Sequence, residues 1–174
     1  MASELRVDKI VPTGGAPTGG AGGIIQVVQV VKTDTFSTTG VTYVDITGLT
    51  KTITYTAGNK ILVMFNGNIG MDESAQMGNI RISTPSAVLH AATGDASGSR
   101  QRATTSGRHY DTASISSVSF CYIDSPSGTS NTYKVQMCSA NPGRVTYLNR
   151  SGADDNALYR TRTASTLTLM ELSA

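Results

Sequence analysis

The sequence predicts an all-β fold: a jelly-roll-like antiparallel β-sandwich, preceded by an extended N-terminal arm and a glycine-rich linker. Three observations lead to this expectation. About eight to ten short runs of β-branched and aromatic residues follow one another, with turn residues roughly every 8–12 positions, as in sandwiches and barrels. No segment sustains the 3.6-residue period of an amphipathic helix. The 174 residues, 39% of them hydrophobic, are enough to bury one core beside a short appendage.

The N-terminal region divides into an arm and a linker, followed by the predicted domain at residues 24–174. Residues 1–13 alternate weakly and are too short to fold alone, so we expect them to become ordered only against another molecule, as a docking arm. Residues 14–23 are dominated by glycine without the every-third-residue spacing of collagen, which is typical of a flexible linker. The apolar positions of the arm are Leu5, Val7, Ile10 and Val11.

Strands are predicted throughout the first half of the domain. The first and fourth are rich in Val, Ile and Leu, which indicates burial, whereas the second and third alternate polar and apolar residues. Gly48 and the Asn66-Gly67 dipeptide are interpreted as turns that end the strands before them. Residues 72–77 have room for one helical turn at most. These strands are expected at residues 24–32, 42–46, 51–56, 60–66 and 78–83.

The second half continues the β pattern. A Ser-Pro-Ser-Gly turn separates two of the strands, so we predict that these two pair as a hairpin. The last strand alternates cleanly and closes the chain. The strands are expected at residues 87–91, 114–124, 132–139, 145–148 and 166–172.

Composition argues against several classes of partner. Only 15% of the residues are charged, the net charge is +2, and the basic residues form no stripe interleaved with aromatic side chains. We therefore expect no nucleic-acid binding. The longest apolar stretch, residues 24–31, is too short to span a membrane. The first residues lack the apolar centre of a signal peptide, so we expect the chain to be made in a cytoplasm and to stay soluble there.

The sequence offers little that resembles an active site. His90 and His109 lack partners at the spacing of a closed metal site, so we expect neither metal nor cofactor. No G-x-S-x-G elbow and no phosphate-binding loop occur, which favours a non-enzymatic protein. Cys121 and Cys138 are interpreted as small buried residues, and a disulfide between them is left open because the intervening loop does not fix the register.

The longest irregular segment, residues 93–112, is the candidate partner-binding loop. It is rich in Gly, Ser, Thr and Arg, and long loops in compact domains are usually functional or disordered. A mobile, solvated loop is the equal alternative. The side chains proposed to contact a receptor or partner are Arg100, Arg102, Arg108, His109 and Tyr110.

Five segments at both ends of the chain and in its first third have a recognisable pattern. They are Ser-Glu-Leu-Arg-Val-Asp-Lys-Ile-Val-Pro at 3–12, Gly-Ile-Ile-Gln-Val-Val at 23–28, Thr-Asp-Thr-Phe-Ser-Thr at 33–38, Val-Asp-Ile-Thr-Gly-Leu at 44–49, and Ser-Thr-Leu-Thr-Leu-Met-Glu-Leu at 165–172. These segments resemble small virion structural and tail-fibre-like proteins of marine and cyanobacterial bacteriophages. Residues 72–110 have no counterpart in that resemblance.

The resemblance implies a homotrimeric sandwich in a virion, with the arm docked on another virion protein of the capsid or tail. The expected function is that of an accessory fibre or adhesin, and a host surface glycan is the candidate receptor. A capsid decoration, or cement, protein that braces the shell is the alternative. A glycan-binding or glycan-degrading module is a minor third.

Overall fold

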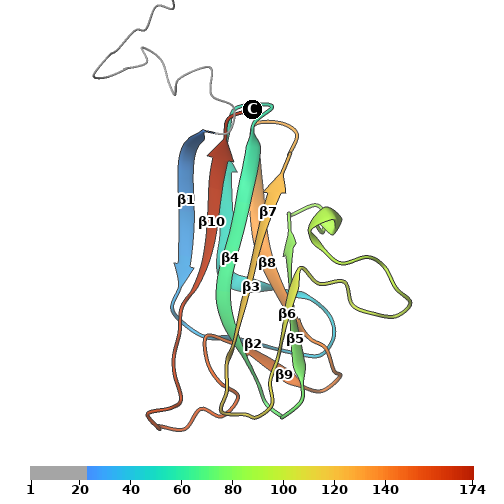
Figure 1. Ribbon diagram of the computed structural model, residues 1–174, viewed down its shortest axis with the longest axis vertical. Helices are drawn as coiled ribbons and strands as arrows, with labels where there is room; N and C mark the ends of the chain where they lie inside the picture. Colours follow the sequence, from blue (N-terminus) through green and yellow to red (C-terminus); the bar gives the residue numbers. More distant parts are fainter. Residues whose placement is uncertain (1–22) are drawn as a thin grey trace, which may run out of the picture.

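The computed structural model describes residues 23–174, which form two antiparallel sheets packed face to face (Figure 1). The prediction of an all-β sandwich is confirmed. The arm, with Leu5, Val7, Ile10 and Val11, and all of the linker except Gly23 lie outside the described residues. The elements are β1 (Ile24–Lys32), β2 (Phe36–Thr39), β3 (Val44–Thr54), β4 (Lys60–Met71), β5 (Met77–Ser83), the 3₁₀ turn η1 (His90–Ala92), β6 (Thr105–Arg108), β7 (Ser116–Asp124), β8 (Ser130–Ser139), β9 (Val145–Leu148) and β10 (Ser165–Leu172).

The two sheets have the strand order of a jelly roll. In one, here called the β4 sheet, β1, β10, β4 and β7 are neighbours, and β9 and β2 extend it. In the other, the β8 sheet, the order is β3, β8, β5 and β6. The chain passes between the sheets at most of its connections, as jelly rolls do. The first and last strands pair with each other, which places both ends of the domain together (Figure 1).

The core lies between the sheets and follows the period of two. Alternate side chains of β4, β8 and β10 point inward and are fully buried. Each large apolar side chain buried in this way contributes roughly 1.5–3 kcal/mol. The rings of Phe65 and Phe120 stack across β4 and β7 with centroids 5.5 Å apart. The inward residues include Ile61, Val63, Ile69, Tyr133, Val135, Met137, Leu167 and Leu169.

Asn149 joins the strands where β9 ends. It is fully buried and has φ +64°, a left-handed conformation that Asn tolerates better than most residues. Its side-chain Nδ2 donates to the carbonyls of Lys32 (2.9 Å) and Asp34 (3.0 Å). Its Oδ1 accepts from Ser165 Oγ at 2.6 Å, and its backbone N–H donates to Asn68 O at 2.8 Å. One side chain thus connects the end of β1 to the beginning of β10.

Glu171 plays a comparable part near the end of the domain where residues 23 and 174 lie. The carboxylate is buried and accepts hydrogen bonds from Gln26 Nε2 (2.6 Å), Thr56 N (2.8 Å) and Asn59 Nδ2 (2.6 Å). Burial alone would raise the pKa of Glu171, but these donors outweigh it and hold that pKa below its usual value. The carboxylate therefore stays charged inside a fully satisfied hydrogen-bond network.

The predicted turn at Asn66-Gly67 is not formed, because β4 continues to Met71. A Cβ atom at Gly67 would overlap the side chains of Phe65 and Ser165. One at Gly70 would overlap the backbone of the segment that follows β9. Glycine inside this strand marks the close approach of neighbouring chain rather than a turn.

The predicted hairpin between the strands flanking Ser-Pro-Ser-Gly is also not formed. β7 pairs with β4, whereas β8 pairs with β3 and β5 in the opposite sheet. The connecting segment bridges two sheets, which pack about 10 Å apart, instead of making a tight turn. It is held by Tyr55, whose N–H donates to Thr129 O (2.8 Å) and whose hydroxyl donates to Ser127 O (2.9 Å).

Three smaller predictions are corrected. The strands expected at 42–46 and 51–56 are one strand, β3, with an irregularity near Gly48 at φ +87°. The strand expected at 87–91 reduces to an isolated bridge between Val88 and Ser83, followed by η1. Residues 72–77 hold a bend and turn with Ala75 at φ +58° in place of a helical turn. β2 and β6 were not predicted, because their short sequences carry little apolar alternation.

Cys121 and Cys138 are both free, so the open question of a disulfide is answered by their placement in opposite sheets. Cys138 is buried as expected, and burial raises its pKa to about 11. Cys121 is exposed on the outer face of the β4 sheet, contrary to the expectation.

We predict that Asn149→Ala lowers the free energy of unfolding by about 3–5 kcal/mol. The carbonyls of Lys32 and Asp34 lose their donor, and Ala is strained at positive φ. Asn149→Gly should be about 1 kcal/mol less damaging, since Gly adopts this φ freely. The control is Asn156→Ala in an exposed turn, expected to change stability by less than about 0.5 kcal/mol. Chemical denaturation measures all three. Equal stability of Asn149→Ala and the control would contradict this role for Asn149.

Candidate binding pocket

The segment between β5 and β6, residues 84–104, projects from the β5–β6 edge of the β8 sheet (Figure 1), and its C-terminal part contacts the outward-facing Asn79 of β5. A tight turn starts it: Thr84 N donates to Ala87 O at 2.8 Å. Leu89 and Ala92 then pack against the core, so apolar burial secures this part of the loop. The remainder, which is polar, depends on hydrogen bonds to the sheet.

Gln101 fixes the polar part of the loop to the sheet. Its Nε2 donates to Val41 O at 2.7 Å, and its Oε1 accepts from Asn79 Nδ2 at 2.5 Å. The hydroxyl of Tyr43 donates to Arg102 O at 3.1 Å. Tyr43 is itself covered by Arg81, whose guanidinium carbon lies 4.0 Å from the ring centroid. The loop is therefore anchored at several points, which favours a preformed surface over the mobile alternative.

Arg102 connects two parts of its own loop by hydrogen bonds. Its Nε donates to Gly94 O at 2.6 Å, and Nη2 donates to His90 O at 3.2 Å. Gly94 N in turn donates to Ala103 O at 3.0 Å. The guanidinium binds carbonyl groups of its own loop, so Arg102 supports the wall of the pocket, and its role as a partner residue stays a prediction.

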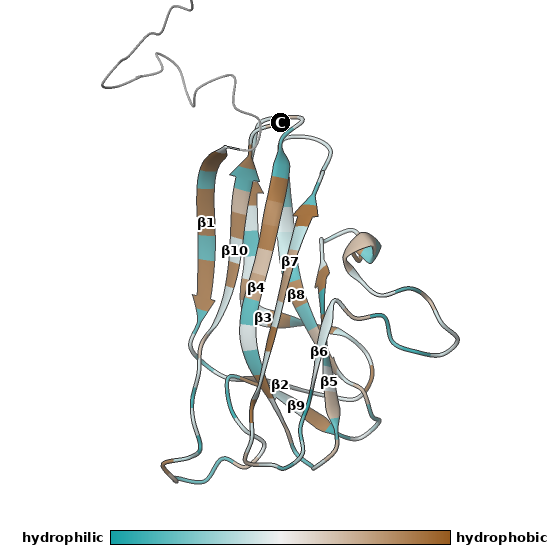
Figure 2. Cartoon of the chain, in the orientation of Figure 1, coloured by the Kyte–Doolittle hydropathy of each residue, from teal (hydrophilic) through white to brown (hydrophobic). Residues whose placement is uncertain are grey.

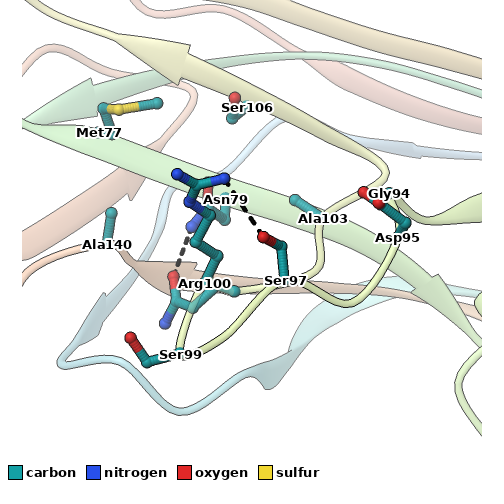
Figure 3. Close-up of a pocket in the computed structure, with 11 residues that line it drawn as sticks. Met77, Asn79, Gly94, Asp95, Ser97, Ser99, Arg100, Ala103, Ser106 and Ala140 are labelled. Atoms are coloured by element: carbon teal, nitrogen blue, oxygen red, sulfur yellow. Dashed lines mark hydrogen bonds between the residues drawn. The ribbon is translucent and has the colours of Figure 1, made fainter.

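Between this loop and β5, β6 and the end of β8 lies a cavity of about 660 Å³ (Figure 3). This volume is within the range of small-molecule sites. Its floor is formed by outward-facing side chains of the sheet, and its wall by the loop. The lining residues are Met77, Asn79, Gly94, Asp95, Ser97, Ser99, Arg100, Gln101, Ala103, Ser106 and Ala140.

Of the five predicted partner residues, only Arg100 lines this pocket. Arg108 and Tyr110 are exposed beside the pocket. The guanidinium carbon of Arg108 lies 5.6 Å from the centroid of the Tyr110 ring. His109 departs from the prediction, because it is only 1% exposed and offers no surface to a partner. Alternation explains this: Gly107 and His109 point into the sandwich while Arg108 and Tyr110 point outward.

His109 is buried, and within residues 23–174 neither of its ring nitrogens makes a hydrogen bond of normal geometry. Burial lowers the pKa of this imidazole, because the charged form loses its hydration. The nearby carbonyls of Ile69 and Ser114 and the carboxylate of Asp111 favour the charged form, but they do not offset burial. Asp111 is already engaged, accepting from Ser114 N and Oγ at 2.7 Å each.

Within residues 23–174, no three His, Cys, Asp or Glu side chains are grouped as a metal ion would require. The neighbouring Asp154 and Asp155 each pair with an arginine. Arg162 Nη2 lies 2.5 Å from Asp154 Oδ1, and Arg160 Nε lies 2.7 Å from Asp155 Oδ1. In the part of the chain that the structure describes, no helix is long and apolar enough to cross a membrane.

The outer face of the β4 sheet carries a second candidate surface, the apolar row. Paired positions on four strands place Val27 beside Met170, Met170 beside Leu62, and Leu62 beside Ile123. Val27 is 53% exposed and Ile123 is 51% exposed. Figure 2 shows apolar segments in the upper parts of β1, β4 and β7, where this row lies.

Two neighbouring rows on this face also carry no charge, and Lys60 lies beyond the apolar row at the end of β4. The first consists of Gln29, Thr168, Met64 and Cys121. The second consists of Val31, Thr166, Asn66 and Ser119. A shallow hollow of about 330 Å³ lies among these residues. The face is therefore uncharged over three rows, unlike the outer face of the β8 sheet, which carries Arg81, Lys134 and Asp45.

No protein-family model matches the sequence, and no curated protein matches it either. The likeness to phage virion proteins therefore stays a prediction.

Sequence reasoning found the pocket's loop but missed most of its lining. Met77, Asn79 and Ser106 come from strands, and Asp95 belongs to the loop but was not singled out. Asn79 carried a signal, since it alternates with the apolar Ile80 and Ile82 and so faces outward. What covers an outward-facing residue is decided by the path of a loop, which alternation does not predict.

We predict that the protein loses stability as the pH falls through about 6.5, the usual pKa of an unfolded histidine. The folded-state pKa of His109 is lowered, so below that pH the unfolded chain binds the proton more readily and unfolding becomes easier. Melting temperatures between pH 7.5 and 5.0 test this, above the range where carboxylates titrate. His109→Leu should flatten the profile, whereas the exposed control His90→Asn should keep it. An unchanged profile in His109→Leu would contradict the assignment.

Proposed function

We propose that this chain is a non-enzymatic attachment protein of a bacteriophage virion, an accessory fibre or adhesin tethered by its N-terminal arm. The observation that carries the proposal is the contrast between the two outer faces of the sandwich. One face has three uncharged rows, one of them apolar and exposed, and the other bears a loop-walled pocket. This contrast suits a protein that assembles through one surface and binds a receptor through another.

The pocket on the β8 sheet is the proposed receptor site. Its loop is anchored by Gln101 and Tyr43, so a ligand would meet groups already in position. Five of the eleven lining residues carry hydroxyl or amide groups, and Met77 is an apolar contact. This chemistry suits a glycan, whose hydroxyl groups need donors and acceptors close together.

Hydrolysis of that glycan is less well supported than binding. Glycosidases of both common types use two carboxyl groups about 5–9.5 Å apart. Asp95 is the one carboxylate among the residues that line this pocket. Binding without cleavage is the better fit to a single carboxylate.

The outer face of the β4 sheet is the proposed contact between copies of the chain in a homotrimer. A surface repeated around a symmetry axis lies near its own charges, so an uncharged face avoids repulsion between copies. The described chain also begins beside this face, where Gly23 N donates to Ser173 Oγ at 3.0 Å. Copies joined here would bring their arms together, and several arms would attach with greater avidity than one.

The attachment proposal is tested on an array of bacterial surface oligosaccharides with the full chain. Replacing residues 95–100 by a Gly-Ser repeat removes one wall of the pocket but keeps Gln101 and Arg102. We expect binding by the native chain and a loss of at least about tenfold, or 1.4 kcal/mol, in the variant. Replacing the exposed residues 125–128 is the matched control and should leave binding unchanged. Absence of glycan binding by the native chain would count against this function.

Self-association is tested by Ile123→Lys, which places a charge in the apolar row at an exposed position. We expect a trimer for the native chain and a monomer for the variant in analytical ultracentrifugation, because a buried unpaired charge opposes association. The control is Leu158→Lys in the distant loop after β9, where the side chain is fully exposed. A native chain that sediments as a monomer, or a trimeric Ile123→Lys, would contradict the assignment.

A capsid decoration protein is the second candidate, and the apolar row favours it too. Val27 and Val31 are exposed on the edge strand β1, a surface that would equally suit contact with a shell protein. Quantitative mass spectrometry of purified particles separates the two candidates. Hundreds of copies per particle would support decoration, and a few to a few tens would support a fibre.

A further inference from the structure

The pocket holds two opposite charges that do not pair with each other. Arg100 and Asp95 both line it, yet within residues 23–174 neither takes part in an ion pair. Arg100 Nη1 donates to Ser97 Oγ at 3.3 Å, a long hydrogen bond. A guanidinium has five N–H donors in a planar fork, so most of those on Arg100 are open to a ligand.

The two charges lie at different places in the pocket (Figure 3). The Arg100 side chain crosses its centre, with the guanidinium near Asn79 and directed toward the side where Met77 and Ser106 lie. Asp95 lies beyond Ser97, next to Gly94. A ligand that satisfies both must therefore present an anion at one point and hydroxyl donors at another.

We infer that the pocket binds an acidic sugar, with its carboxylate on Arg100 and its ring hydroxyls on Asp95 and the neighbouring serines. This inference rests on the proposed attachment function and specifies its ligand. The guanidinium fork matches a carboxylate with two parallel hydrogen bonds. Asp95 accepts from hydroxyl groups, and Met77 contacts the apolar side of a sugar ring.

Other ligand classes use this set of groups less well. A neutral sugar leaves the guanidinium of Arg100 without an anion. A small inorganic anion pairs with Arg100 but leaves Asp95 and the serines on the other side of the pocket without a partner. The volume of about 660 Å³ has room for more than such an ion.

The experiment compares acidic sugars with the same sugars made neutral. The probes are trigalacturonic acid, trimannuronic acid and sialyllactose, each paired with its methyl ester, titrated calorimetrically into the full chain. We expect at least one acid to bind on the order of ten- to a hundredfold tighter than its ester, the range for a charge-assisted hydrogen bond. Higher salt should weaken the acid more than the ester.

Two variants test whether the preference for the acid over its ester arises at Arg100. Arg100→Gln should bring the affinity for the acid down to that for the ester. Arg162→Gln makes the same change of charge in the loop after β9 and should preserve the difference, because its exposed ion pair with Asp154 contributes little to stability. Preference for the acid that survives Arg100→Gln would overturn the assignment to this pocket.

The remaining outcomes separate this inference from the attachment function. If acids and esters bind equally and replacement of residues 95–100 abolishes both, the acidic class is overturned and glycan attachment stands. If none of the acids binds, the acidic class is overturned, and the oligosaccharide array decides the attachment function independently.

Discussion

The structure depends on how a single edge of β4 accommodates two strands. Residues 60–66 of β4 pair with β10, and residues 69–71 pair with β9. The gap between them is bridged by Asn149, whose N–H donates to Asn68 O and whose side chain bonds to the end of β1 and the beginning of β10. A buried polar group stabilises only when its partners are complete. The partners of Asn149 are complete, and the segment that follows β9 packs tightly against Gly70.

This arrangement leaves each outer face of the sandwich to serve a separate purpose. The core takes the inward side chains of both sheets, so specificity for partners resides in the outward ones. On the β4 sheet the outward side chains are uncharged in three rows across β1, β10, β4 and β7, and Lys60 lies at the end of this face. On the β8 sheet they are polar and support the loop of residues 84–104. The proposed function places assembly and receptor binding on these two opposite surfaces of one small domain.

Hydrogen bonds to neighbouring segments distinguish the pocket's loop from an ordinary surface loop. Gln101, Arg102 and Tyr43 hold the loop through hydrogen bonds whose acceptors are mostly backbone carbonyls, so the support depends little on other side chains. Arg100, with one long hydrogen bond, is left with most of its donors free. Two arginines separated by one residue thus have different roles, because one reaches back into its own loop and the other extends over the cavity.

The sequence by itself determined the all-β class and several strands, including residues 24–32 and 145–148, because the period of two is local and survives any packing. It also identified Arg100 through the length and composition of its loop. Strand partners were decided only by the tertiary structure: β7 and β8 are consecutive yet lie in different sheets. The tertiary structure also decided that His109 is buried and that β4 continues through Gly67. Pairing and close approach depend on residues far apart in the chain, and no local pattern records which of them will meet.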